Sequence, residues 1–141
     1  MDTDRIEREI LIDAPPERVW AELIEFFWVN ARGGALTVVP GARLVTRDEH
    51  DHEYPIVIER ADPHSVLSYR WASAYPGREP GAGNSTLVEF TLTEEAGRTR
   101  LQVIESGFAT LPEQDGRQAF QDNTGGWDWV LDRLTTATTA A

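Results

Sequence analysis

The sequence predicts an α+β domain in which a curved antiparallel sheet wraps around one long C-terminal helix. Two observations support this fold class. From residue 35 onward apolar residues recur at every second position between regular turn signals, whereas Asp115 to Ala137 has helical spacing. The chain has 141 residues, of which 40% are hydrophobic and 26% charged. These values are typical of a globular protein, and we expect one domain over residues 1–141.

The N-terminal part predicts a strand followed by a short helix. Ile6, Ile10 and Ile12 alternate with other residues, as in a strand with one aliphatic face. The segment Asp13–Glu17 then supplies a cap candidate, two prolines and an early acid, all typical of a helix start. We expect this helix to bend or end near Phe26–Asn30.

The middle of the chain predicts an antiparallel meander. Its longest connection is the Pro- and Gly-rich loop Tyr75–Asn84, and Thr110 and Glu113 then have the spacing of a capping box before the last helix. The expected strands are Leu36–Val39, Arg43–Arg47, Tyr54–Arg60, Val66–Ser73, Thr86–Thr93 and Arg98–Phe108.

The C-terminal helix has an uneven inner face. Its first half presents Phe120, Asn123 and Thr124, which differ in polarity, and its second half is aliphatic. A buried polar group without a partner costs about 1–3 kcal/mol, so we expect the first half to face a cavity and the second a dry core. The residues at inward spacing are Phe120, Thr124, Trp127, Leu131 and Leu134.

Two adjacent glycines, Gly125 and Gly126, interrupt this helix at a cost of about 1 kcal/mol each. Tight packing, or the close approach of the sheet or of a ligand, would account for them. The Thr- and Ala-rich tail is expected to fray from about residue 136.

Composition excludes several classes of partner. The net charge of −11 opposes binding to nucleic acid and to anionic membranes. The sequence has no Cys and no Lys, which removes thiolate and Schiff-base chemistry. No signal peptide and no apolar run long enough for membrane insertion is visible, so we expect a cytoplasmic protein.

Five segments together resemble the SRPBCC (START-like, helix-grip) superfamily, within it the branch named for the C-terminal domain of the activator of heat-shock protein 90 ATPase. The resemblance covers nearly the whole chain. It rests on Ile6–Trp20, Tyr69–Trp71, Asn84–Leu92, Glu105–Phe108 and Gly126–Trp127.

The resemblance implies a sheet of the seven-stranded type that grips the C-terminal helix around a deep hydrophobic cavity. Members of this superfamily bind lipids, sterols, polyketides or plant hormones, and some catalyse cyclisation or hydrolysis. The segment Ile24–Gly34 looks shorter than the family's second-helix region. The family's co-chaperones also have a separate N-terminal domain, for which this chain has no room, so a chaperone partner is disfavoured.

Glu105 is the most informative single residue. In the last strand it shares a face with Leu101 and Val103, so a carboxylate follows two aliphatic side chains on the expected cavity side. An apolar setting would raise its pKa and suit it to act as an acid, a base or a polar anchor. The alternative is a position at the open end of the strand, where the carboxylate is hydrogen-bonded to a loop or solvated.

The candidate ligand-binding residues line the inner faces of the helix and the sheet. Aromatic side chains there could form the floor of an apolar pocket, although such residues are more often simply core. The set consists of Trp28, Tyr69, Trp71, Phe90, Val103, Glu105, Phe120, Asn123, Thr124 and Trp127.

The turn Asp48–Glu53 contains a weak metal-like cluster. His50 and His52 could project to one side of a hairpin with carboxylates beside them, but a solvated acidic turn explains the pattern equally well. We therefore expect neither a metal nor another cofactor.

Three functions stay open. We favour a binding protein for a small hydrophobic molecule over an enzyme. The alternatives are a polyketide cyclase- or hydrolase-like enzyme with Glu105 as acid or base and Tyr69 or Asn123 stabilising oxygen charge, and a co-chaperone-like interaction module. Exposed sheet edges allow a monomer or a homodimer.

Overall fold

The computed structural model describes residues 4–28, 39–47 and 52–139; the side chains of 25–28 and 47 lie outside this description. The described elements follow one another in the order expected for an α+β chain. They are β1 (Arg5–Ile12), α1 (Pro16–Trp28), β2 (Arg43–Arg47), β3 (Glu53–Asp62), β4 (Val66–Trp71), β5 (Thr86–Glu95), β6 (Arg98–Ser106), the 3₁₀ helix η1 (Phe108–Thr110) and α2 (Glu113–Thr139).

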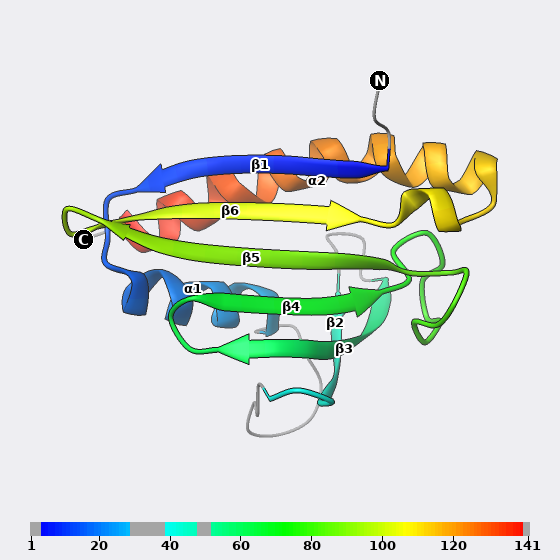
Figure 1. The fold of residues 1–141 in the computed structure, drawn as a ribbon, viewed down its shortest axis with the longest axis horizontal. Helices are drawn as coiled ribbons and strands as arrows, with labels where there is room; N and C mark the ends of the chain where they lie inside the picture. Colours follow the sequence, from blue (N-terminus) through cyan, green and yellow to red (C-terminus); the bar gives the residue numbers. More distant parts are fainter. Residues whose placement is uncertain (1–3, 29–38, 48–51, 140–141) are drawn as a thin grey trace.

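The strands form one antiparallel sheet in the order β1-β6-β5-β4-β3-β2 (Figure 1). The predicted antiparallel meander is therefore confirmed from β2 onward, and β1 closes on β6 so that Ile6 lies opposite Glu105. Six strands occur within the described part of the chain, against the seven-stranded type that the resemblance implies. Of the expected strand Leu36–Val39, residues 36–38 lie outside the description and Val39 is not in a strand.

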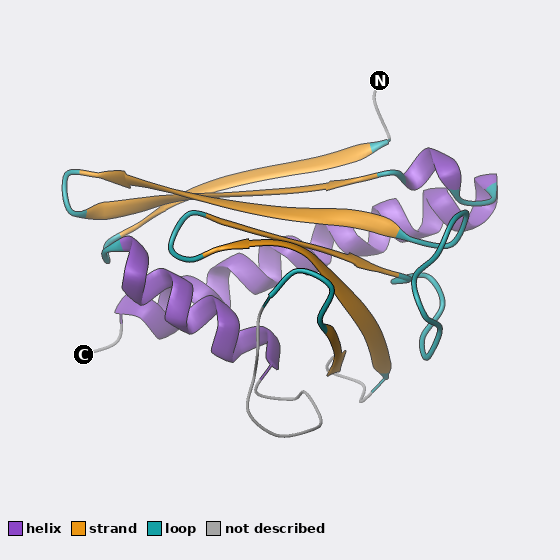
Figure 2. Cartoon of the chain, turned by 60° about the horizontal axis from the view of Figure 1, so that its bottom comes forward, coloured by secondary structure: helices purple, strands orange, loops and turns teal. Residues whose placement is uncertain are grey.

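Both helices lie on the same face of the sheet, and the strands curve around them (Figure 2). Alternation in β5 explains how the sheet covers the core, since Val88, Phe90 and Leu92 point inward and are buried. The equivalent residues of β6 are Leu101 and Val103. The apolar core thus lies between this face of the sheet and the two helices.

Helix α2 is longer at both ends than the predicted Asp115–Ala137. Trp127, Leu131 and Leu134 are buried, as the spacing predicts. The helix also continues through Thr139, past the point where fraying is expected. Thr138 is buried, and its carbonyl oxygen accepts a hydrogen bond of 2.8 Å from Arg18 Nε, which holds this end of α2 to α1.

Among the described residues, none packs closely against the glycine pair of α2. Gly125 and Gly126 are exposed, and a Cβ atom built on either would meet nothing within 4 Å. The expectation that the sheet packs closely against these glycines is therefore wrong, and the expected approach of a ligand stays a prediction. The close approach occurs instead at Gly116, where a Cβ would lie 2.6 Å from the carbonyl oxygen of Phe108.

Because Gly125 and Gly126 face open space, replacing either by alanine should stabilise the protein. The single variants Gly125→Ala and Gly126→Ala are each expected to raise the free energy of unfolding by about 1 kcal/mol, since alanine loses less conformational freedom in a helix. Urea unfolding followed by circular dichroism measures the change. A loss of stability in either variant would show that the structure does not tolerate a Cβ atom at that position.

The predicted capping box at Thr110 and Glu113 does not form. Thr110 ends the 3₁₀ helix η1, and its hydroxyl donates to the carbonyl oxygen of Gly107 at 2.7 Å instead. Gly107 has a φ of 99°, a left-handed conformation that favours glycine and turns the chain out of β6. A separate short turn therefore stands between the last strand and α2.

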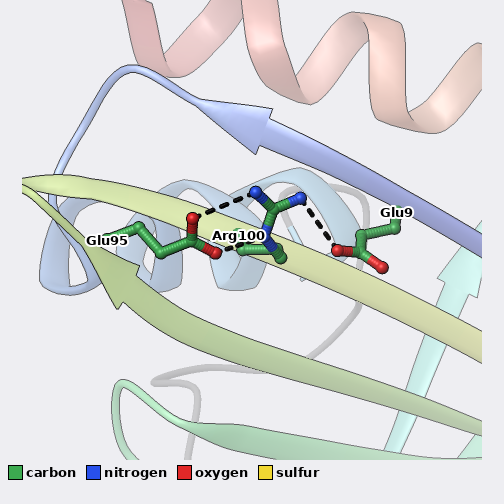
Figure 3. Close-up of polar contacts among 3 residues, drawn as sticks. All are labelled: Glu9, Glu95 and Arg100. Carbon is green, nitrogen blue, oxygen red and sulfur yellow. Dashed lines mark hydrogen bonds and ion pairs between the residues drawn. The ribbon is translucent and has the colours of Figure 1, made fainter.

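The outer face of the sheet carries charged pairs that link neighbouring strands. Arg100 of β6 donates to Glu9 of β1 at 2.9 Å and forms a bidentate pair with Glu95 at the end of β5 (Figure 3). The hydrogen bonds from Arg100 lower the pKa of Glu95, and Glu95 in turn raises the pKa of Arg100. All three side chains are about 40% exposed, so this cluster is a solvated surface feature separate from the core.

Candidate functional site

Glu105 lies on the inner face of β6 and is completely buried. The alternation of β6 places it in line with Leu101 and Val103, and its relative exposure is 0%. The predicted inward position is thus the one observed, and the alternative of a solvated strand end is wrong. A carboxylate at such a position must find hydrogen-bond donors, because burying it unpaired is very costly.

Four side chains supply those donors. Trp71 Nε1 and Thr86 Oγ1 donate to Glu105 Oε2 at 2.9 and 2.5 Å, and Trp127 Nε1 donates to Oε1 at 2.8 Å. Asn123 Nδ2 lies 3.1 Å from both carboxylate oxygens. The donors come from β4, β5 and α2, so one carboxylate joins the sheet to the helix. We call these five residues the Glu105 network.

Every donor in the Glu105 network is neutral, and this determines the electrostatics of the site. Burial raises the pKa of Glu105, while the hydrogen bonds from Thr86, Trp127, Trp71 and Asn123 oppose that shift because they favour the ionised form. The pKa of the neighbouring Tyr69 is also raised, first by its own burial and then by the charge of Glu105. The charge on Glu105 is therefore shared among dipoles and is not neutralised by a cation within the network.

Aromatic rings surround the carboxylate. Trp71 lies 5.9 Å from Tyr69 and 6.2 Å from Trp127, measured between ring centroids. Phe90 lies 5.7 Å from Trp127 in an edge-to-face arrangement. Such contacts stabilise a rigid cluster, and they set the positions of the two indole N–H groups that reach Glu105.

The predicted ligand-binding set divides into buried and half-buried residues. Tyr69, Phe90, Val103 and Trp127 are at most 3% exposed, so they are core residues. The half-buried members are Trp71, Phe120, Asn123 and Thr124.

Two of the predicted residues, Phe120 and Thr124, make their recorded contacts elsewhere. Phe120 packs against Phe108 at 5.5 Å, near the start of α2, and Thr124 donates its hydroxyl to the carbonyl oxygen of Phe120. The side chain of Trp28, also predicted to bind the ligand, lies outside the described residues. The structure thus brings Tyr69, Trp71, Phe90, Val103, Glu105, Asn123 and Trp127 together around one site.

Three further residues belong to this site but escape the sequence analysis. Thr86 has the same alternation as Val88 and so points inward, and it lies opposite Trp71 across the β4–β5 pair. Its phase in β5 could have identified it. Ser73 accepts a hydrogen bond of 2.9 Å from Asn123 Nδ2, and Tyr54 of β3 packs against Trp71 at 5.6 Å. Both depend on contacts between distant segments, for which the sequence gives no local signal.

The loop that connects β4 and β5 contacts the start of α2. Tyr75 donates its hydroxyl to Asp115 Oδ2 at 2.6 Å, which ties the loop to the first turn of the helix and raises the pKa of Tyr75. Asn84 holds the far side of the same loop by accepting from the backbone of Gly81 and donating to that of Glu79. This loop therefore has a defined conformation beside the Glu105 network.

The structure shows no metal site at the weak candidates His50 and His52 within the residues that it describes. His50 lies outside the described residues, and His52 is exposed. Within residues 4–28, 39–47 and 52–139, no group of three or more His, Asp or Glu side chains is placed to hold a metal ion. None of the helices in these ranges combines the length and the apolarity needed to cross a membrane.

Comparison with protein families finds one match over most of the chain. The sequence profile of the family described as "Activator of Hsp90 ATPase homolog 1-like protein" matches residues 13–139. A search of curated proteins finds no match.

Solved structures with the same fold have low sequence identity to this chain. Protein MLL2253 from Mesorhizobium loti is 23% identical, with a TM-score of 0.73 and 94% of each chain covered. The Aha1 dimer from Colwellia psychrerythraea is 19% identical, with a TM-score of 0.74 and 96% of each chain covered. DynU16, a protein of the dynemicin biosynthetic locus, is 22% identical with a TM-score of 0.71; the match covers 96% of this chain but about half of DynU16 (48%). These likenesses support the fold.

Proposed function

Because the chain belongs to the family of activator of Hsp90 ATPase homolog 1-like proteins, within the SRPBCC superfamily, we propose that it binds a small hydrophobic molecule. The binding site lies on the inner face of the sheet beside α2, at the half-buried edge of the Glu105 network. Among the proteins of similar fold, DynU16 comes from a biosynthetic locus, which agrees with a role in small-molecule metabolism.

One observation carries this proposal: Trp71 of the Glu105 network and its neighbour Tyr54 both keep part of their aromatic surface exposed. Trp71 and Tyr54 pack against each other at 5.6 Å and are half-buried, whereas Tyr69 and Phe90 beside them are fully buried. Flat apolar rings next to a few fixed polar groups are typical of sites for small molecules. A ligand that covers Tyr54 and Trp71 would complete the apolar layer there.

The geometry of Glu105 favours binding over catalysis. Its Oε1 accepts from Trp127 and Asn123, and its Oε2 accepts from Trp71, Thr86 and Asn123. These donors occupy the lone pairs that a general base would offer to a substrate. Proton transfer to a ligand would require one of these hydrogen bonds to break first. We therefore place Glu105 in the site as an organising group rather than as the acid or base of a cyclase or hydrolase.

Removing the ring of Tyr54 should weaken binding. N-phenyl-1-naphthylamine is a small apolar molecule whose fluorescence rises in an apolar site, and we expect it to bind the wild-type protein in a saturable titration. In Tyr54→Ala its affinity should fall about tenfold, because the loss of one aromatic contact costs up to about 1.5 kcal/mol.

Trp129→Ala is the matched control, since it removes an aromatic ring from α2 at a position that is 44% exposed. Its ring lies against the Arg133 guanidinium, at 4.9 Å, rather than in the core. The control should bind the probe like the wild type. Equal losses in Tyr54→Ala and Trp129→Ala, or no saturable binding to the wild type, would contradict the proposal. Native mass spectrometry of freshly purified protein then looks for a retained compound.

A further inference from the structure

The Glu105 carboxylate fixes which way the Asn123 amide faces. A carboxylate only accepts hydrogen bonds, so the amide must turn its NH₂ group toward it. Asn123 Nδ2 lies 3.1 Å from both oxygens of Glu105 and 2.9 Å from Ser73 Oγ, and these contacts use both of its hydrogens. Asn123 Oδ1 is attached to the same carbon and therefore faces away from the carboxylate.

This orientation leaves two polar groups open at the half-buried edge of the network. Among the residues that the structure describes, no donor reaches Asn123 Oδ1, and the Ser73 hydroxyl accepts from Asn123 without donating to a described acceptor. Both residues are half-buried, as is Trp71, which also bonds to Glu105. An acceptor, a donor and an aromatic ring thus lie around the same point.

The charge of Glu105 acts on whatever binds there. The four side chains that donate to it are neutral, so the negative charge of its ionised form is not cancelled within the network. Charges interact more strongly in a poorly solvated site than in water, and a second anion beside Glu105 would be repelled. The chain as a whole, with a net charge of −11, adds to this effect.

We propose that Asn123 Oδ1 and the Ser73 hydroxyl recognise an uncharged aromatic molecule that carries an N–H or O–H donor, and that Glu105 excludes carboxylates and other anions from the same site. This inference rests on the proposed function and narrows its ligand class. Asn123 and Ser73 make the polar contacts to the ligand, beside the ring of Trp71. Glu105 is a positioning residue, which acts through the amide it orients and through its charge.

Three related probes test this inference on the unmodified protein. N-phenyl-1-naphthylamine is uncharged and has one N–H group, its N-methyl derivative lacks that donor, and 8-anilinonaphthalene-1-sulfonate carries an anionic group on the same body. We expect the first probe to bind at least tenfold more tightly than either of the others, measured by fluorescence titration. Similar affinities for all three would overturn the inference while leaving the proposed function in place. No saturable binding of any probe would overturn both.

Variants of α2 then identify the acceptor. In Asn123→Ala the two probes N-phenyl-1-naphthylamine and its N-methyl derivative should bind with about equal affinity, because the acceptor for the N–H group is gone. The sulfonate should still bind weakly, since Glu105 stays in place. Gln121→Ala is the matched control: Gln121 is exposed on the same helix, and this variant should keep the tenfold preference. A preference that survives in Asn123→Ala would overturn the role of its Oδ1.

Discussion

Replacing Glu105 by leucine is expected to lower the free energy of unfolding by about 2–4 kcal/mol. The indole N–H groups of Trp71 and Trp127, which ring packing holds in place, both lose the carboxylate that accepts their hydrogen bonds, and a poorly solvated donor without its acceptor costs about 1–3 kcal/mol. The loss of the buried charge offsets part of this cost. Urea unfolding measures the change.

Glu105→Gln is expected to have an intermediate effect, a loss of about 1–3 kcal/mol. The two indoles donate to different oxygens, Trp71 to Oε2 and Trp127 to Oε1. An amide keeps only one oxygen, so whichever way it turns, one indole N–H faces an NH₂ group. Glu89→Gln, on the outward-facing side of β5, is the control and should change stability by less than about 0.5 kcal/mol. A Glu105→Leu variant as stable as the wild type would show that the network contributes no net stability.

The effect of Glu105→Gln should also depend on pH. Burial raises the pKa of Glu105 in the folded protein above its usual value, so the folded state binds a proton more readily than the unfolded chain. The stability from this group is fully present below the usual pKa of a glutamate and is lost as the pH rises through the raised folded pKa. The stability difference between the wild type and Glu105→Gln should therefore shrink over that window and then stay constant. A difference that grows with pH would show that the four donors outweigh burial.

Gly116→Ala is expected to lower the free energy of unfolding by about 1–3 kcal/mol, although alanine is the better helix former. Its Cβ would lie 2.6 Å from the carbonyl oxygen of Phe108, a backbone atom that also accepts a hydrogen bond from the backbone of Leu111. The Phe108 carbonyl group cannot turn away from α2 without weakening that bond. Urea unfolding, with Gly125→Ala measured beside it, checks the prediction.

These two glycine variants make the same chemical change in the same helix, and we expect opposite signs. Gly125→Ala should stabilise the protein because its Cβ meets nothing within 4 Å. If Gly116→Ala were as stable as Gly125→Ala, the contact between η1 and α2 would be free to relax. Circular dichroism of both variants before unfolding verifies that α2 forms.

Periodicity predicts the parts of this protein that depend on alternation. The period of two in β6 places Glu105 inward with Leu101 and Val103, and its complete burial confirms that position. The helical spacing of α2 likewise identifies Trp127 and Leu131 as buried. In both cases the side-chain direction follows from the backbone geometry of the element alone.

Features that depend on contacts between elements are not predicted in the same way. The cost of Gly125 and Gly126 in a helix led to the expectation of a close approach, but that cost gives no information about what lies opposite. The approach occurs at Gly116, because η1 packs there. Likewise, the sequence does not distinguish buried Tyr69 from half-buried Trp71, since both alternate inward and differ only in what covers them.

The Glu105 network also has a consequence for how the chain folds. Its donors come from β4, β5 and α2, and β6 itself pairs with β1 from the other end of the chain. A partly assembled sheet that lacks α2 would bury the carboxylate with only some of its donors, at a considerable energetic penalty. We therefore expect β6 and α2 to open and close as one cooperative unit, so that their backbone amides exchange with deuterated water at similar, slow rates.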